Sequence, residues 1–81
     1  MTANIEIINA EYIDGRTLLI TFNTGEKRRF DFTPIINIYP AFAPLKEDNI
    51  FKNFKITDTL EWDNGRIDIA PEYILNNGTI A

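Results

Sequence analysis

The sequence contains no cysteine, no histidine and no serine. These absences exclude the Ser-His-acid and Cys-His catalytic arrangements and the ligand sets that usually bind zinc. Disulfides are excluded as well. The apolar stretches are too short to cross a bilayer, and the N-terminus MTANIEIINAEY has neither the basic start nor the apolar run of a secretion signal. We therefore expect a cytoplasmic protein without a membrane partner.

The charge of the chain is negative overall and unevenly distributed. The formal net charge is −4, and residues 41–81 hold seven acids against four bases. A negative surface repels the phosphate backbone that supplies most non-specific affinity for nucleic acids, so no direct nucleic-acid binding is expected. The one basic cluster, Lys27-Arg28-Arg29, lies on a predicted strand, where Lys27 and Arg29 face one way and Arg28 the other.

Alternating apolar residues predict a hairpin in the first third of the chain. One set changes phase near Ile7-Ile8, which indicates a long first strand with a bulge. Two further strands flank the turn Asn23-Thr24-Gly25, where Gly25 is expected to adopt positive φ. The alternating apolar residues are Ile5, Ile7, Ile8, Ala10, Tyr12, Leu18, Ile20, Phe22, Phe30 and Phe32.

A second stretch repeats this pattern. ITFNTGEKRRFDFTP and LEWDNGRIDIAP share an aromatic residue, an Asn/Asp-x-Gly turn, an Asp between apolar residues and a final Pro. The repeat predicts a second hairpin, with positive φ at Gly65. The predicted fold is α+β and mostly β, one domain over residues 1–81, with a small antiparallel sheet built from two hairpin units and two or three short helical turns.

The two prolines at the ends of these units predict where strands end and helices begin. Pro cannot donate to a sheet but suits the first turn of a helix, so short helices should start at Pro34 and Pro71, the first with Thr33 as N-cap. Asp31 and Asp68 then either face solvent or accept backbone N–H bonds at the following turns.

The segment between the units predicts less regular structure. Pro40 to Pro44 indicates an irregular crossing segment. Leu45 to Phe51 suits a brief helix in which Asp48 caps the start and Ile50 and Phe51 pack inward.

Two arrangements of carboxylates are candidates for a catalytic site. Phe22-Asn23-Thr24-Gly25 and Trp62-Asp63-Asn64-Gly65 are similar to the paired loops of aspartic proteases, but Asn23 replaces one Asp, so the two loops cannot share a proton. Asp31 and Asp68 are the other candidate pair, and their structural role is the stronger interpretation. We predict no catalytic, cofactor-binding or metal-binding residues.

Three aromatic residues are less tied to a periodic face and form the candidate partner interface: Tyr39, Phe42 and Tyr73. Phe42 lies between alanines and two flanking prolines and is the best candidate for an exposed apolar contact. The alternative is that this loop folds back over the core. Aromatic anchors of this kind tend to carry binding energy.

The same features resemble a known family. Phe22-Asn23-x-Gly25, Phe30-Asp31-Phe32-x-Pro34, Leu45 and Phe51 six residues later, and Trp62-x-Asn64-Gly65 with Asp68-Ile69-Ala70-Pro71-Glu72 resemble the bacterial family called domain of unknown function 2442. The resemblance spans roughly Ile5 to Leu75. It departs at Asp48, where many relatives carry Pro, and at Tyr73-Ile74.

The resemblance implies a small α+β protein without known activity. Some members look fused to a helix-turn-helix segment, and others appear beside a second small protein, an arrangement similar to toxin–antitoxin pairs. We expect a non-enzymatic, cytoplasmic protein-binding module, antitoxin-like, with a protein partner or a homodimer. The alternative is a regulator that acts on nucleic acid through a partner, and a carboxylate-dependent hydrolase comes last.

Overall fold

The computed structural model describes residues 4–81 and has an α+β fold of short strands and short helices. In chain order these are β1 (Ile7–Asp14), β2 (Thr17–Phe22), β3 (Lys27–Asp31), α1 (Thr33–Ile38), the 3-10 helix η1 (Pro40–Lys46), α2 (Asp48–Lys52), β4 (Lys55–Ile56), β5 (Leu60–Trp62), β6 (Ile67–Ile69), α3 (Pro71–Asn77) and β7 (Thr79–Ile80). The predicted fold class is confirmed.

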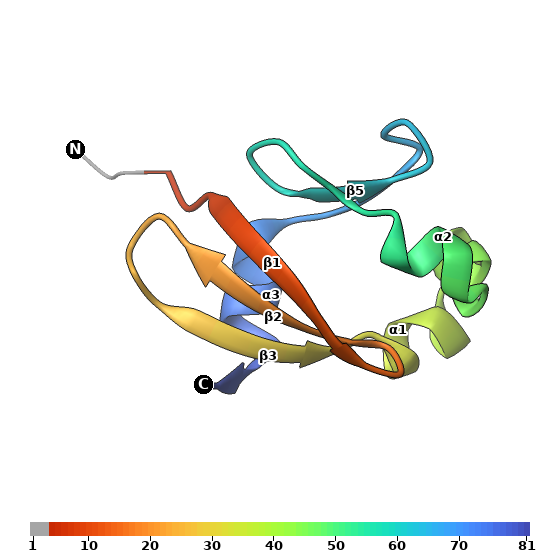
Figure 1. Cartoon of the computed structure of the whole chain (residues 1–81), viewed down its shortest axis with the longest axis horizontal. Helices are drawn as coiled ribbons and strands as arrows, with labels where there is room; N and C mark the ends of the chain where they lie inside the picture. Colours follow the sequence, from red (N-terminus) through yellow and green to blue (C-terminus); the bar gives the residue numbers. More distant parts are fainter. Residues whose placement is uncertain (1–3) are drawn as a thin grey trace.

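The strands form two antiparallel sheets, each built around one hairpin unit, and the C-terminal β7 joins the first. The first has the order β1-β2-β3-β7 and the second the order β4-β5-β6. Figure 1 shows the second sheet above the first, with α1 and α2 gathered at one end of the molecule and α3 behind the first sheet. Within residues 4–81, none of the helices has the length and apolar character that a membrane crossing requires.

The predicted bulge in β1 is confirmed. Ile7 pairs with Phe22 and Asn9 with Thr21, so Ile8 is an extra residue in the ladder. Ile8 is 57% exposed while Ile7 is buried, because a bulge reorients the side chains next to it.

Both hairpin turns have the backbone that their glycines predict. Gly25 has φ +90° and Gly65 has φ +84°, a region that residues with a Cβ rarely adopt. Asp63 and Asn64 also have positive φ, so the second turn is left-handed over three successive residues. The N–H of Gly25 donates to the carbonyl oxygen of Phe22 at 2.9 Å, which closes the first turn.

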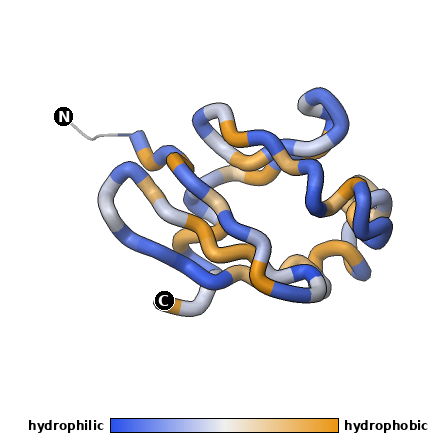
Figure 2. The backbone as a smooth tube through the Cα atoms, in the orientation of Figure 1, coloured by the Kyte–Doolittle hydropathy of each residue, from blue (hydrophilic) through white to orange (hydrophobic). Residues whose placement is uncertain are grey.

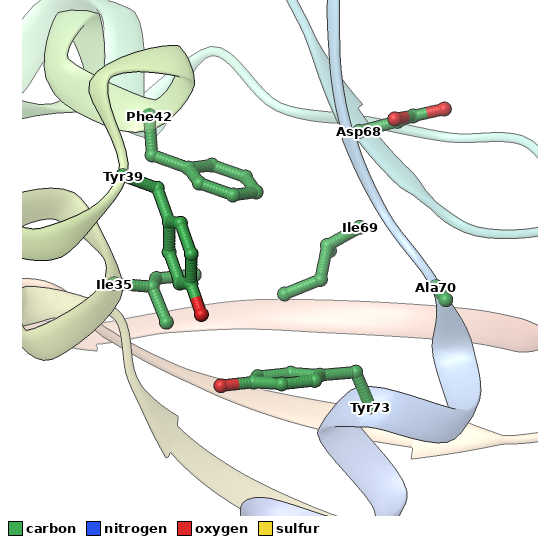
Figure 3. Close-up of a pocket in the computed structure, with 7 residues that line it drawn as sticks. All are labelled: Ile35, Tyr39, Phe42, Asp68, Ile69, Ala70 and Tyr73. Atoms are coloured by element: carbon green, nitrogen blue, oxygen red, sulfur yellow. The ribbon is translucent and has the colours of Figure 1, made fainter.

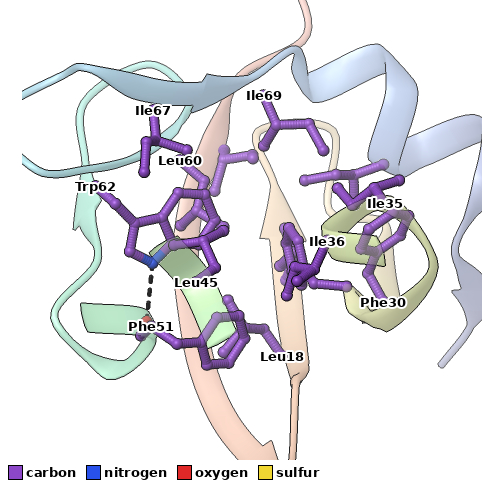
Figure 4. Close-up of a cluster of buried hydrophobic side chains, with 14 of the residues drawn as sticks. Leu18, Phe30, Ile35, Ile36, Leu45, Phe51, Leu60, Trp62, Ile67 and Ile69 are labelled. Atoms are coloured by element: carbon purple, nitrogen blue, oxygen red, sulfur yellow. Dashed lines mark hydrogen bonds between the residues drawn. The ribbon is translucent and has the colours of Figure 1, made fainter. Parts of the chain in front are cut away.

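The core lies between the two sheets and the helices (Figure 4). Its centre is aromatic: the ring of Trp62 meets Phe32 edge-on at 5.4 Å. Ile50 is exposed on α2, so the expectation that it packs inward is wrong, while its neighbour Phe51 is fully buried. The buried residues are Ile7, Leu18, Ile20, Phe22, Phe30, Phe32, Ile35, Ile36, Leu45, Phe51, Leu60, Trp62, Ile67, Ile69 and Ile74.

The helix starts follow the prolines but not all of the predicted caps. Pro34 and Pro71 lie in the first turns of α1 and α3. Thr33 is the first helical residue and not the N-cap, and its N–H donates to the Asp31 carboxylate at 2.9 Å. At α3 the N-cap is Ala70 with no side-chain cap, and Asp68 is exposed, so of the two alternatives for Asp68 the structure has the one that faces solvent.

The segment from Pro40 to Pro44 is helical, where an irregular crossing was expected. It belongs to η1, and the N–H of Phe42 donates to the carbonyl oxygen of Tyr39 at 3.0 Å. Pro40 has the φ that such a helix needs and lacks only an N–H that the first turn leaves free, while Pro44 lies inside the helix. Asp48 is the first residue of α2 and provides no side-chain cap, because its carboxylate pairs with Arg16 at 2.6 Å.

Candidate functional site

A shallow apolar groove lies between the helical segment and the second sheet. Its cavity volume is about 260 Å³. One wall comes from α1, the residue after it and η1, and the other comes from β6 and the start of α3 (Figure 3). The residues that line it are Ile35, Tyr39, Phe42, Asp68, Ile69, Ala70 and Tyr73.

Local structure places Tyr39 and Phe42 on the first wall. The N–H of Tyr39 donates to the carbonyl oxygen of Ile35 at 2.9 Å, which ends α1, and the extended backbone at Tyr39 (φ −106°, ψ 116°) redirects the chain into η1. The rings of Tyr39 and Phe42 then meet edge-on with their centroids 6.4 Å apart. The pair forms one continuous aromatic wall.

Tyr73 is held on the opposite wall by α3. Its helical neighbour Ile74 is fully buried and anchors α3 against the core. The Tyr73 ring meets Phe30 edge-on at 6.0 Å, which fixes the ring over the first sheet. Figure 3 shows the rings of Tyr39 and Tyr73 extending into the same space from the two walls.

The groove combines exposed aromatic surface with very few polar groups. Tyr39 is 50% exposed and Tyr73 is 40% exposed. The polar side chains at the groove are the two tyrosine hydroxyls and Asp68, whose carboxylate points away from the other lining side chains in Figure 3. Sites for drug-sized ligands and cofactors usually measure about 300–1,000 Å³ and hold several converging polar groups. This groove is suited to one or two apolar side chains.

The surface next to the groove carries negative charge. Asp68 and Glu72 are exposed on either side of the lining residues Ile69 and Ala70, and no Lys or Arg lines the groove. A second depression, of about 280 Å³, begins at Pro71 and holds Glu6, Asp58 and Glu72. No group of acids within residues 4–81 has an arrangement that could hold a metal ion.

The structure brings together the three aromatic residues that the sequence singled out. Tyr39, Phe42 and Tyr73 all line this one groove, and their role in binding stays a prediction. Phe42 is half-buried and packs against the core, so the structure has the alternative in which this loop folds back over the core. Asp31 lies outside the groove on β3, and its carboxylate is bonded to the Thr33 N–H, so the structure does not pair it with Asp68 here.

Sequence reasoning missed several residues of this region. Ile35, Ile69 and Ala70 line the groove although they read as core or connecting residues. For Ile69 the available signal is its position at the end of a strand, two residues before Pro71, because a strand that ends at a surface leaves part of its last apolar residue at that surface. No local sequence pattern identifies Ile35 as a residue of the groove.

Arg16 was also missed, and it holds the helical segment onto the first sheet. Its guanidinium donates to the carbonyl oxygen of Lys46, pairs with Asp48 at 2.6 Å and lies 5.2 Å from the centre of the Phe51 ring. The hydrogen bond and the charge of Arg16 lower the pKa of the Asp48 carboxyl. This contact fixes the position of η1, which carries one wall of the groove.

Comparison with known protein families matches residues 7–79 to the family described as Protein of unknown function (DUF2442). The match covers nearly the whole chain, so the chain belongs to this family and the resemblance noted in the sequence is confirmed. No curated protein and no solved structure matches the chain.

Proposed function

We propose that this member of the DUF2442 family is a non-enzymatic, cytoplasmic protein-binding module that receives an apolar side chain of a second small protein in the groove. We call the module antitoxin-like because, as in toxin–antitoxin pairs, it would act by binding a second small protein. The observation that carries the proposal is the exposure of Tyr39 and Tyr73 in one apolar depression. Tyrosines in such depressions are typical of the residues that carry binding energy at protein interfaces.

The volume of the groove limits the size of the apolar group that a partner can insert. A cavity of about 260 Å³ is too small for a typical cofactor and accommodates one or two apolar side chains. Edge-on contacts between aromatic rings add about 0.5–1.5 kcal/mol beyond the burial of their area. An aromatic or long aliphatic anchor on the partner therefore fits this surface best.

The charges around the groove define the polar part of the partner. Asp68 and Glu72 are exposed at the rim, and the net charge of the chain is −4. Complementary charges accelerate association and disfavour acidic partners. We expect the partner to carry Lys or Arg next to its apolar anchor, and we expect its association rate to fall as the ionic strength rises.

The test compares a groove variant with a matched variant elsewhere on the surface. Tyr39→Asp places a charge in the groove at a half-exposed position, and Ile80→Asp makes the same kind of change on β7, where Ile80 is 78% exposed. Tagged parent, Tyr39→Asp and Ile80→Asp are used to capture proteins from the native cytoplasm, and the captured protein is then titrated by calorimetry. We expect parent and Ile80→Asp to bind one small basic protein with equal affinity, and Tyr39→Asp to bind it at least about 30-fold more weakly.

Two outcomes would contradict the proposal. In the first, the three proteins capture the same set of molecules in equal amounts. In the second, the captured partner binds Tyr39→Asp as tightly as it binds the parent. Thermal melts of both variants accompany the experiment, because loss of binding is informative only where the variant remains folded.

A further inference from the structure

The apolar groove runs along the open edge of the second sheet. Asp68 and Ile69, which end β6, and Ala70, which follows it, all line one wall of the groove (Figure 3). Among residues 4–81, β6 pairs with β5 on one side and with no strand on the other. A group bound in the groove therefore lies beside the free edge of a strand.

The backbone groups of Asp68 face this free edge. In an antiparallel pair, the N–H and C=O of one residue point to the same side, and successive residues alternate. The carbonyl oxygen of Ile69 faces β5, because it accepts a hydrogen bond from the hydroxyl of Thr59, the residue that precedes β5. The N–H and C=O of Asp68 consequently point away from β5, in the direction of an added strand.

One row of side chains on the outer face of the second sheet ends in two adjacent acids. The register sets Lys55 opposite Glu61 and Glu61 opposite Asp68, so a base and two acids follow one another across β4, β5 and β6. None of the ion pairs of residues 4–81 includes Glu61 or Asp68. Like charges directly opposite each other are unfavourable in a sheet. A base on a strand next to β6 would make the charges of this row alternate.

β4 shows how this sheet pairs with a strand that carries such a base. Lys55 is exposed beside Glu61, while its neighbours Phe54 and Ile56 are half-buried and pack against the core. Across a row of an antiparallel sheet, hydrogen-bonded and non-hydrogen-bonded pairs alternate. A strand added to β6 would therefore meet Asp68 with the pairing that Lys55 has with Glu61. The order apolar, basic, apolar in β4 is thus a template for the added strand.

We propose that the groove binds an extended segment of the partner, which adds to β6 as an antiparallel strand and has the order apolar, Lys or Arg, apolar. This rests on the proposed function and adds the conformation and the order of the residues that bind. The Lys or Arg lies opposite Asp68, exchanges both backbone hydrogen bonds with it and places its charge beside the carboxylate. In such additions the main-chain bonds provide affinity and the alternate side chains provide specificity.

The direction of the added strand determines which apolar residue is the anchor. Ile69 lines the groove, whereas Ile67 is not among the lining residues. In an antiparallel strand, the residue directly before the Lys or Arg lies opposite Ile69. Its side chain points to the same face as that of Ile69 and enters the groove between Phe42 and Tyr73, which flank Ile69 in Figure 3. The aromatic or long aliphatic anchor therefore comes directly before the base.

The charges at the two ends of β6 limit where further bases can lie on the segment. Arg66 lies toward the turn between β5 and β6, which Figure 2 shows as a hydrophilic loop, and pairs with Asp63 at 3.8 Å. Glu72 is exposed at the other end, in the first turn of α3. In the antiparallel direction, the residue two positions after the base lies next to Arg66. A second base is therefore disfavoured there and favoured directly before the anchor.

The test titrates the isotope-labelled protein with a synthetic peptide and follows its amide signals by nuclear magnetic resonance. The probe is acetyl-Thr-Thr-Phe-Lys-Ile-Thr-Thr-amide, whose three central residues have the order found in β4. We expect a dissociation constant of about 0.1–1 mM, which a titration to about 5 mM covers. In the bound state the N–H of Asp68 should exchange with solvent at least about tenfold more slowly, while exchange at Ile69, whose N–H faces β5, changes little.

Variants of the protein and of the peptide separate the effects of charge, order and backbone bonds. Asp68→Lys should weaken binding at least about tenfold, and a peptide with Glu in place of Lys should bind Asp68→Lys within about threefold of the original pair. Exchanging Phe and Lys in the peptide places the charge in the groove and should abolish binding. N-methylation of the Lys amide removes the N–H that bonds to Asp68 and should weaken binding at least about tenfold. Glu11→Lys makes the same change of charge on the first sheet and should leave binding unchanged.

The contrary results distinguish strand addition from the groove itself. If Tyr39→Asp abolishes binding but the N-methylated peptide binds as tightly as the probe, the groove takes a side chain without strand addition, and only the proposed function stands. Binding that Tyr39→Asp leaves unchanged contradicts both proposals. A probe that does not bind the parent at about 5 mM, or that slows exchange along β1 and not at Asp68, overturns the addition to β6. Amide spectra that match the parent away from the substitution establish that each variant is folded.

Discussion

The indole N–H of Trp62 donates a hydrogen bond to the backbone carbonyl oxygen of Phe51 at 2.8 Å, and their two rings stack with centroids 6.1 Å apart. Phe51 lies in the last turn of α2, where carbonyl groups have no partner within the helix. Trp62 therefore ties the second sheet to α2 (Figure 4). This one side chain fills the centre of the core and also satisfies a buried polar group.

Replacing Trp62 by Phe should lower the free energy of unfolding by about 2–3 kcal/mol, because the variant leaves a buried carbonyl unsatisfied and a cavity beside it. Urea denaturation measures the change. Tyr12→Phe is the matched control, since it removes an aromatic donor whose bond to Gly15 is exposed, and it should cost less than about 0.5 kcal/mol. Equal losses in the two variants would show that the bond to Phe51 contributes nothing specific.

Asp31 and Asp68 occupy equivalent places in the two hairpin units and should respond differently to substitution. Asp31→Ala removes the acceptor of the Thr33 N–H and should cost about 1 kcal/mol. Asp68→Ala should cost less than about 0.5 kcal/mol, because α3 begins without a side-chain cap. Chemical denaturation of both variants decides between this and the equivalence that the sequence suggests, under which the two losses would match.

Gly25→Ala and Gly65→Ala should each destabilise the fold by about 1–2 kcal/mol, because both positions have strongly positive φ. The space around both positions is open or bounded only by the flexible end of Glu61, so the cost comes from the backbone and not from a clash. Thermal melts give the comparison. Asn76→Ala, an exposed change within α3, serves as the control and should leave the melting temperature nearly unchanged. A glycine variant as stable as the parent would refute the positive φ at that turn.

The ion pair between Arg16 and Asp48 should make stability depend on pH in the acid range. Arg16 lowers the pKa of Asp48 below its ordinary value of 3.8, so the unfolded chain binds the proton more readily than the folded chain does. The contribution is present above that value and is lost as the pH falls through the lower folded pKa. Asp48→Asn should therefore be slightly less stable than the parent at pH 7, and the difference should disappear in strong acid.

Denaturation of the parent and Asp48→Asn at several pH values measures this dependence. Asp63→Asn provides the control, because the ion pair between Asp63 and Arg66 is long at 3.8 Å and both side chains are exposed. Exposed pairs of this kind contribute little to stability. A difference between parent and Asp48→Asn that stays constant from pH 7 to strong acid would show that the charge of Asp48 does not contribute.

The strands and turns could be predicted because their signals are local. Leu18, Ile20 and Phe22 alternate with residues of the other face, and a strand with one buried face requires that period. The same period predicted that Arg28 faces away from its two basic neighbours. Its guanidinium indeed lies on the buried side, where it donates to the carbonyl oxygen of Leu75 at 3.0 Å.

The candidate site could be predicted only in part. Tyr39, Phe42 and Tyr73 fit no periodic face in the sequence, and the structure gathers them in one groove. The burial of Phe42 could not be predicted, because it depends on where η1 packs. That position is set by Arg16, which reaches the carbonyl oxygen of Lys46 thirty residues away along the chain.

The sequence by itself determined the two hairpins, their glycine turns and the prolines that start α1 and α3, because each depends on residues within a few positions of one another. Only the tertiary structure decided that the hairpins form separate sheets, that Asp31 bonds to a helix start while Asp68 does not, and that a groove joins Ile35 to Tyr73. These features depend on how elements distant in sequence pack together, and packing is governed by the shape and volume of all the side chains at once.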